Sequence, residues 1–364
     1  MKPQRQYIQS LATLQFVAVI AIVLTHFWLQ NGTYLQALCT SLCFVYSGFF
    51  TALTHRDDRQ YHLADHLRFM RDKLAKLYPL HVLALGLSLL VIYIGWHYQL
   101  VFSKMTLAHL LLISPWFTTP SFYFGINPVS WFICDLFFLY LISPWLIRGV
   151  RHFNLAWQGA IVALLIVGEL IAGYATDPGS PSLLISNNAH YYLYEFPLIR
   201  VLDFTTGIVL YHLTLTHRWH SATSRLTPSR ATLIELCAIA LCIAFYFMGE
   251  RLLHPHWYRA FCSMVPIVIV ALGTLVFTSD NMGLIARAMC VTPLPVMSKL
   301  CAEVYLLQFG AYHGIRFLVN WLGLPSHGIP YFFFQMGGLL LLSWAVHHYV
   351  TMPLYRHLKS HECP

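Results

Sequence analysis

Long apolar runs recur along the chain and alternate with short polar connections. Ten of these runs can form helices that cross a bilayer, whose hydrocarbon core of about 30 Å needs about 20 residues of α-helix. The predicted spans are Ile8–Leu29, Leu35–Thr54, Leu77–Trp96, Trp131–Ile147, Ala156–Tyr174, Leu198–His217, Leu233–Met248, Trp257–Phe277, Leu300–Leu322 and Tyr331–Val350. The pattern therefore predicts an all-α integral membrane protein, a multi-pass bundle of ten transmembrane helices.

Lysines and arginines gather in alternate connections between these spans. The two terminal segments and the connections after the second, fourth, sixth and eighth spans hold 17 of the 22 Lys and Arg. Such an excess marks the cytoplasmic side of a membrane protein. Both termini are therefore predicted to be cytoplasmic, as an even number of spans also requires. The net charge of +8 is then explained by the basic residues that orient the chain in the membrane, and no nucleic-acid partner is expected.

The composition supports the same class, with 58% hydrophobic and 10% charged residues, against about 25% charged in soluble domains. A single transmembrane domain over residues 1–364 is expected, with no appended soluble domain. The first span lacks the cleavage site of a signal peptide. Nine scattered cysteines without paired spacing are interpreted as apolar fillers, and no metal site is predicted. Segment 97–127 is interpreted as an outward loop with a partly embedded helix over Leu107–Phe117.

Polar residues inside a span are candidates for chemistry, because the bilayer makes them costly. Gln15 and His26 lie eleven residues apart on one face of the first span. The residues between them on that face are apolar, so His26 needs a partner on another helix or on a ligand. Its ordinary pKa, about 6.5, suits proton transfer at neutral pH. The alternative is a packing histidine bonded to a backbone carbonyl.

Five further spans carry carboxylates, with Glu169 and Glu235 in the fifth and seventh spans. Asp135 could orient His26, pair with a cation or be held protonated by burial. Arg200 and Asp203, at i and i+3, are expected first of all to neutralise each other. Glu303 lies near the start of the ninth span.

Four cations precede the third span: Arg68, Arg71, Lys73 and Lys76. Lys73 and Lys76 share a helical face, and a cluster this dense at the membrane surface suits phosphate groups. The alternative is a topology signal that also binds anionic lipid headgroups.

Seven segments, in this order, resemble the acyltransferase-3 family of membrane O-acyltransferases. They are Leu14-Gln15-Phe16 through His26, Ser47-Gly48-Phe49, Phe69 through Pro79, Trp131-Phe132-x-x-Asp135-Leu136, Arg200-x-x-Asp203-Phe204-x-x-Gly207, Tyr305-Leu306-Leu307 and Met352-Pro353-Leu354. The resemblance covers nearly the whole chain. No single segment is specific, whereas seven in register are.

The resemblance implies transfer of an acyl group, with acetyl expected, from cytoplasmic acyl-CoA to a hydroxyl of a cell-surface or exported glycan. It also implies a bacterial inner-membrane location. His26 is then the catalytic base, with Asp135 as its carboxylate. The implied donor-binding residues are Lys73, Lys76, Arg71, Arg68 and Gln15. The implied acceptor-binding residues are Trp131, Tyr305, Arg200, Asp203 and Glu303.

The chain departs from the family pattern at several of these positions. Gln15 replaces an arginine, Lys73 and Lys76 replace an arginine pair, and Gln308 replaces a histidine. Lysine keeps the charge but loses the bidentate geometry that arginine offers to phosphate. A subgroup with another donor or acceptor, an inactive member, and a transporter or flippase for a glycan or small metabolite remain the alternatives. The transporter class often shows repeated halves, and none is recognisable in this sequence.

Overall fold

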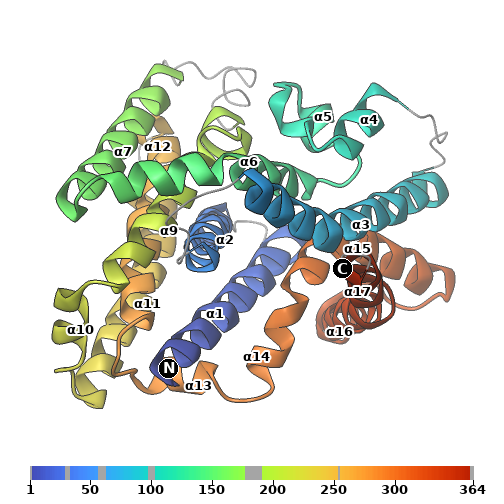
Figure 1. Ribbon diagram of the computed structural model, residues 1–364. Coiled ribbons are helices and arrows are strands. Elements are labelled where there is room, and N and C mark those ends of the chain that lie inside the picture. Colours follow the sequence, from blue (N-terminus) through green and yellow to red (C-terminus); the bar gives the residue numbers. More distant parts are fainter. Residues whose placement is uncertain are drawn as a thin grey trace. The chain divides into compact units, whose positions relative to one another are not determined.

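A computed structural model describes residues 2–28, 33–55, 63–96, 103–176, 191–252 and 255–360 (Figure 1). Throughout these ranges the regular structure is helical, and they contain no β-strand. The chain divides into two compact units. Unit 1 comprises Met1–Arg59 and Phe138–Lys299, and unit 2 comprises Gln60–Phe137 and Leu300–Pro364.

Unit 1 is built from long apolar helices joined by short ones. Its elements are α1 (Lys2–Phe27), α2 (Thr33–Thr54), α7 (Leu155–Thr176), the π-helical turn η2 (Tyr191–Glu195), α9 (Arg200–Thr214), α10 (His217–Thr223), α11 (Pro228–Leu252), α12 (Pro255–Phe277), α13 (Leu284–Met289) and α14 (Leu294–Met297). The helix α2 packs against α1, α9 and α12, so it forms the centre of the unit (Figure 1).

Unit 2 is organised around the longest helix of the described chain. Its elements are α3 (Leu63–Trp96), α4 (Lys104–Leu110), the 3₁₀ turn η1 (Ser114–Trp116), α5 (Pro120–Tyr123), α15 (Cys301–Trp321), α16 (Gly328–Val346), the π-helical turn η4 (His347–Thr351) and α17 (Met352–Ser360). The helix α15 packs against both α3 and α16. The helix α6 (Ser130–His152) starts in unit 2 and continues into unit 1, and the 3₁₀ turn η3 (Ser298–Leu300) precedes α15.

Two glycines set the crossing of α2 and α9 in unit 1. A Cβ atom on Gly48 would overlap the backbone carbonyl of Phe204, and one on Gly207 would overlap the carbonyl of Val45. Small residues let helix backbones approach this closely inside a membrane. The Ser47-Gly48-Phe49 segment and the Phe204-x-x-Gly207 segment are therefore two halves of one helix contact.

Seven helical segments of the described chain are long and apolar enough to cross a membrane: Gln6–Phe27, Leu35–Thr54, Leu63–Gly95, Ser130–His152, Tyr191–Thr214, Pro228–Phe245 and Gly328–Lys359. Leu155–Gly168 and Val265–Phe277 are shorter apolar stretches. The ninth predicted span forms the helix α15, but its polar residues, among them Glu303 and Arg316, lower its mean hydropathy. The all-helical membrane class is thus supported, while the count of ten spans stays a prediction.

Two helical segments extend beyond the predicted spans because helix continues through polar sequence. The third span was predicted to start at Leu77, and α3 already starts at Leu63 and carries the basic cluster, with Pro79 inside it. The tenth span was predicted over Tyr331–Val350, and the helical segment that contains it runs from Gly328 to Lys359, with the π-helical turn η4 inside it. The length of an apolar run does not reveal the polar helical turns that continue the helix beyond the run.

The helix predicted over Leu107–Phe117 begins earlier in the structure and is shorter. The helix α4 begins earlier, where the Ser103 hydroxyl accepts a hydrogen bond from the backbone N–H of Thr106 (3.3 Å). It ends before Leu112, whose φ of 59° is left-handed and cannot continue a helix.

The segment after α3 runs back along that helix. The hydroxyl of Tyr78 donates to the carbonyl of Leu110 (3.0 Å), and Nε2 of His81 lies 2.9 Å from the carbonyl of His109. His81 precedes the last residue of α3, Trp96, by 15 residues, which is about 22 Å along the helix axis. The helix α4 therefore contacts the middle of α3 and not only its C-terminal end.

Candidate functional site

The histidine predicted as base lies at the end of α1, in unit 1. Nε2 of His26 is 2.9 Å from Nε2 of Gln36, in the first turns of α2, and the imidazole is half-buried. As placed, the Gln36 amide nitrogen donates to Nε2 and the ring proton of neutral His26 is on Nδ1. With the amide reversed, its oxygen accepts from Nε2–H instead and the lone pair of the ring is on Nδ1. Gln36 is thus a partner on another helix, as the sequence required. Gln15 lies on the same helix and is also half-buried.

Asp135 is fully buried, in the second turn of α6. His26 belongs to unit 1 and Asp135 to unit 2, so the pairing of these two residues stays a prediction. A buried carboxylate is costly in either unit and needs a specific reason to be present.

The cation cluster lies on α3, in unit 2. Arg68, Arg71 and Lys76 are exposed, whereas Lys73 is half-buried with its Nζ 5.2 Å from the centre of the Phe69 ring. The two lysines that the sequence treated as equivalent therefore differ. Lys76 presents its charge to solvent, and Lys73 folds back over an aromatic ring of its own helix.

A second histidine forms a closer pair than His26 does. Nδ1 of His347, the first residue of η4, lies 2.8 Å from Oε1 of Glu303 in the first turn of α15. The other carboxylate oxygen, Oε2, is buried and has no hydrogen-bond partner in the described part of the chain. Both elements of the pair, α15 and η4, contact α3, the helix that carries Lys76.

The two aromatic residues predicted to bind the acceptor lie in the core of unit 2. Trp131 and Tyr305 are buried, and the rings of Phe132 and Tyr305 are 4.9 Å apart. The side chain of Asn127 donates to the carbonyl of Leu306 (3.0 Å) and so holds the start of α6 against α15. Packing in the core of unit 2 therefore explains the burial of both aromatic residues. Their role in binding the acceptor stays a prediction.

Arg200 and Asp203 form the ion pair that their spacing predicts. Nη1 of Arg200 is 2.7 Å from Oδ2 of Asp203, and both side chains are buried in unit 1. The guanidinium also lies over the rings of Phe44 (5.1 Å) and Tyr194 (4.7 Å), and its Nε donates to the carbonyl of Tyr194. Arg200 therefore ties η2 and α2 to α9, which is a structural function.

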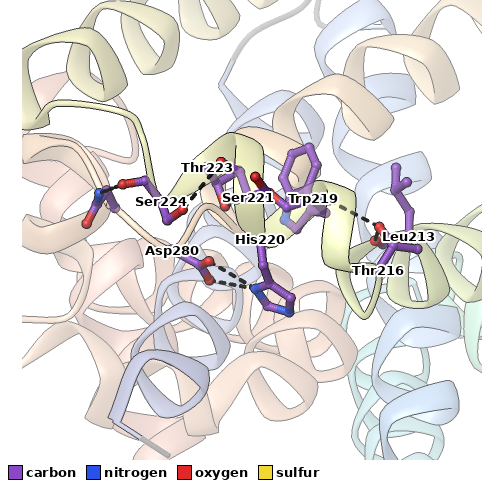
Figure 2. Close-up of polar contacts among 9 residues, drawn as sticks. Leu213, Thr216, Trp219, His220, Ser221, Thr223, Ser224 and Asp280 are labelled. Atoms are coloured by element: carbon purple, nitrogen blue, oxygen red, sulfur yellow. Dashed lines mark hydrogen bonds and ion pairs between the residues drawn. The ribbon is translucent and has the colours of Figure 1, made fainter.

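Two other acidic residues are also explained by structure. Glu235 accepts hydrogen bonds from the backbone N–H groups of Gly283 (2.9 Å) and Ile285 (3.0 Å), and so caps the start of α13. Asp280 faces His220 of α10, with both carboxylate oxygens within 3.1 Å of Nδ1 (Figure 2). This second pair is exposed and fastens α10 to the segment that follows α12.

Sequence reasoning missed Gln36 and His347 as members of the candidate site. Both are polar residues inside predicted spans, and that signal was available for each. What the sequence lacked was the partner, because Gln36 and Glu303 reach their histidines from other helices.

The fold and these polar groups define an all-helical membrane protein with buried histidine and carboxylate chemistry. The chain belongs to the acyltransferase-3 family, whose model, described as an acyltransferase domain, matches residues 8–348. This match confirms the resemblance found in the sequence and makes the protein an acyltransferase. It is similar to the acyltransferase MdmB of Streptomyces mycarofaciens, with 25% identity over 309 residues, 78% of this chain and 74% of the relative. No solved structure matches the chain.

Proposed function

We propose that this protein is a membrane O-acyltransferase that moves an acyl group, acetyl in the first instance, from cytoplasmic acyl-CoA to a hydroxyl of a cell-surface or exported glycan. Family membership over residues 8–348 and the similarity to an acyltransferase support the reaction class. The distribution of Lys and Arg supports cytoplasmic termini. A bacterial inner-membrane location is part of the proposal and follows from the family resemblance.

The observation that carries the proposal is the hydrogen bond between His26 and Gln36. With the Gln36 amide oxygen accepting from Nε2–H, the Nδ1 lone pair of the neutral imidazole can take the proton of an attacking hydroxyl. Such a base contributes about 10²–10⁴-fold to rate. The hydroxyl oxygen forms the new ester bond to the acyl carbon as the carbon–sulfur bond breaks. The sulfur leaves as the CoA thiolate and receives the proton.

The donor binds at the cationic part of α3. Lys76, with Arg68 and Arg71, presents exposed positive charge to the phosphates of CoA. Binding the nucleotide end of the donor holds the thioester near the reacting hydroxyl, which is an entropic gain. Lys73 contributes less directly, because its ammonium group lies over Phe69.

Acyl transfer from radiolabelled acetyl-CoA to membrane glycan tests the proposal. His26→Ala should remove incorporation at matched expression, whereas His217→Ala, a change at an exposed histidine of α10, should leave it unchanged. The double change Lys73→Ala with Lys76→Ala should raise the donor concentration needed, and Lys104→Ala, an exposed lysine of α4, is its control.

Equal incorporation by the His26 variant would eliminate His26 as the base. No incorporation by the unmodified protein, with acetyl-CoA and longer acyl-CoA donors tested in turn, would argue for another donor or for the transporter class.

A further inference from the structure

A cavity of about 480 Å³ lies between α3 and α15 within unit 2. Aliphatic side chains of α3, among them Leu87, Leu90 and Ile94, line one wall. The other wall carries His313, Arg316 and Asn320 of α15. A cavity of this size is within the range of small-molecule sites. No role in acyl transfer is assigned to it above.

The polar wall is a stripe on one face of α15. His313, Arg316 and Asn320 follow at intervals of three and four residues, which places them above one another on the helix. Arg316 is exposed, and no carboxylate of the described residues pairs with it. No acidic side chain is among the described residues that line the cavity. Arg316 therefore presents positive charge beside the hydrogen-bonding side chains of His313 and Asn320, with no carboxylate counterion among the described residues.

The positive charge of Arg316 favours a ligand that carries an anionic group. An arginine on a helix predicted to cross the membrane is costly unless it reaches water, an anion or another polar partner. Guanidinium binds phosphate oxygens through paired N–H donors. The facing wall is aliphatic and suits a hydrocarbon chain. A molecule that satisfies both walls has a phosphate at one end and a chain at the other.

We infer that this cavity binds the phosphate group of a membrane lipid, with the phosphate on Arg316 and the chain along α3. The phosphate can belong to a glycerophospholipid or to an isoprenoid phosphate, since both offer the same group beside a chain. The inference is independent of the acyl donor and of the role of His26.

Native mass spectrometry of the purified full-length protein tests the inference. Dioleoyl phosphatidic acid and undecaprenyl phosphate are compared with dioleoylglycerol and undecaprenol, which keep the chains and lack the phosphate. The phosphorylated lipid of one pair or both should bind, and Arg316→Gln should weaken that binding roughly tenfold or more, as expected for the loss of a charge-assisted hydrogen bond. Which pair shows the preference identifies the source of the phosphate.

Three variants separate the ligand site from effects on folding. Arg316→Lys keeps the charge and should retain most of the binding, and Arg287→Gln, on α13 of unit 1, should change nothing. Leu90→Trp fills the apolar side of the cavity and should weaken binding while Arg316 is intact. Equal binding of phosphorylated and unphosphorylated lipids, or unchanged binding by Arg316→Gln, would overturn the inference.

Discussion

His347 and Glu303 form a buried pair in unit 2, with 2.8 Å between Nδ1 and Oε1. The residues are far apart in the sequence and meet because α16 packs on α15 and the π-helical turn η4 begins at His347. Such turns are frequent at functional sites. The second oxygen of Glu303 has no hydrogen-bond partner among described residues, so the pair is not fully satisfied. A buried histidine–carboxylate pair is a candidate for proton transfer as well as for packing.

Replacement of Glu303 should therefore separate stability from activity. Glu303→Gln keeps an oxygen acceptor for the imidazole and should fold with little change, yet lower acyl transfer by roughly tenfold or more. Glu303→Ala leaves the buried histidine unpaired and should lower the free energy of unfolding by about 1–3 kcal/mol as well. Thermal unfolding in detergent and acyl transfer are measured on both variants.

His348→Ala is the matched control for this pair. His348 is the next residue and is exposed, with its Nδ1 3.2 Å from the carbonyl of Trp344 and its ring beside those of Trp344 and His347. It should keep activity and stability. Full activity of Glu303→Gln would make the pair purely structural.

The α2–α9 crossing should be intolerant of a single methyl group. Gly48→Ala or Gly207→Ala places a Cβ against a backbone carbonyl that cannot rotate away, so the helices must separate. We expect a loss of about 1–3 kcal/mol in the free energy of unfolding for each, the usual cost of overpacking. Gly149→Ala on α6 meets nothing within 4 Å and should be neutral or slightly stabilising. Unfolding in detergent measures all three, and a neutral Gly48→Ala would show that the helices adjust.

Stability should fall as the pH is lowered through the range set by His109. Burial, with the nearby charge of His81 as a smaller cause, lowers the pKa of His109 from 6.5 to about 4. Between these values the unfolded chain binds a proton that the folded chain does not, so the contribution is present above pH 6.5 and is lost toward pH 4. The full loss amounts to about 3 kcal/mol.

The comparison of wild type with His109→Gln isolates this contribution. Carboxylates and other histidines titrate in both proteins, so only the difference between their stability–pH curves belongs to His109. Unfolding is followed at several pH values from 7 down to 4, with the variant expected to lose less stability over that range. Parallel curves would show that His109 does not retain its neutral form in the folded protein.

The sequence predicted the helical membrane class and the family, because apolar length and seven ordered motifs are local properties of the chain. The motif Arg200-x-x-Asp203 lies on one helix, and its ion pair was correctly predicted from spacing alone. The pairing of Gly48 with Phe204 was not, since it depends on how two distant helices cross. The order of the motifs identifies the family, whereas the contacts between helices show what each motif does in the structure.

The candidate site was predictable only where one helix carries the whole arrangement. His26 was singled out correctly as a histidine that needs a partner, but its contact with Gln36 required the approach of α2. Glu303 was singled out for an acceptor, while its contact with His347 depends on the π-helical turn. The sequence also contained no sign that Lys73 and Lys76 differ, because the position of the Lys73 ammonium group over the Phe69 ring depends on side-chain conformation.

The contact between Gln36 and His26 should tune catalysis without being essential to it. Gln36→Leu removes the side-chain hydrogen bond at Nε2 that helps to orient the imidazole. We expect kcat/KM for acyl transfer to fall by roughly 10-fold, less than the loss in His26→Ala, because the base is still present but less well oriented. The KM for acetyl-CoA should stay within about twofold, since the change removes no donor contact. Gln335→Leu, which removes a buried glutamine from α16 in unit 2, is the control for the loss of a buried amide. A Gln36 variant with unchanged kcat/KM, or one that loses only affinity for the donor, would show that the imidazole does not depend on this contact for its orientation.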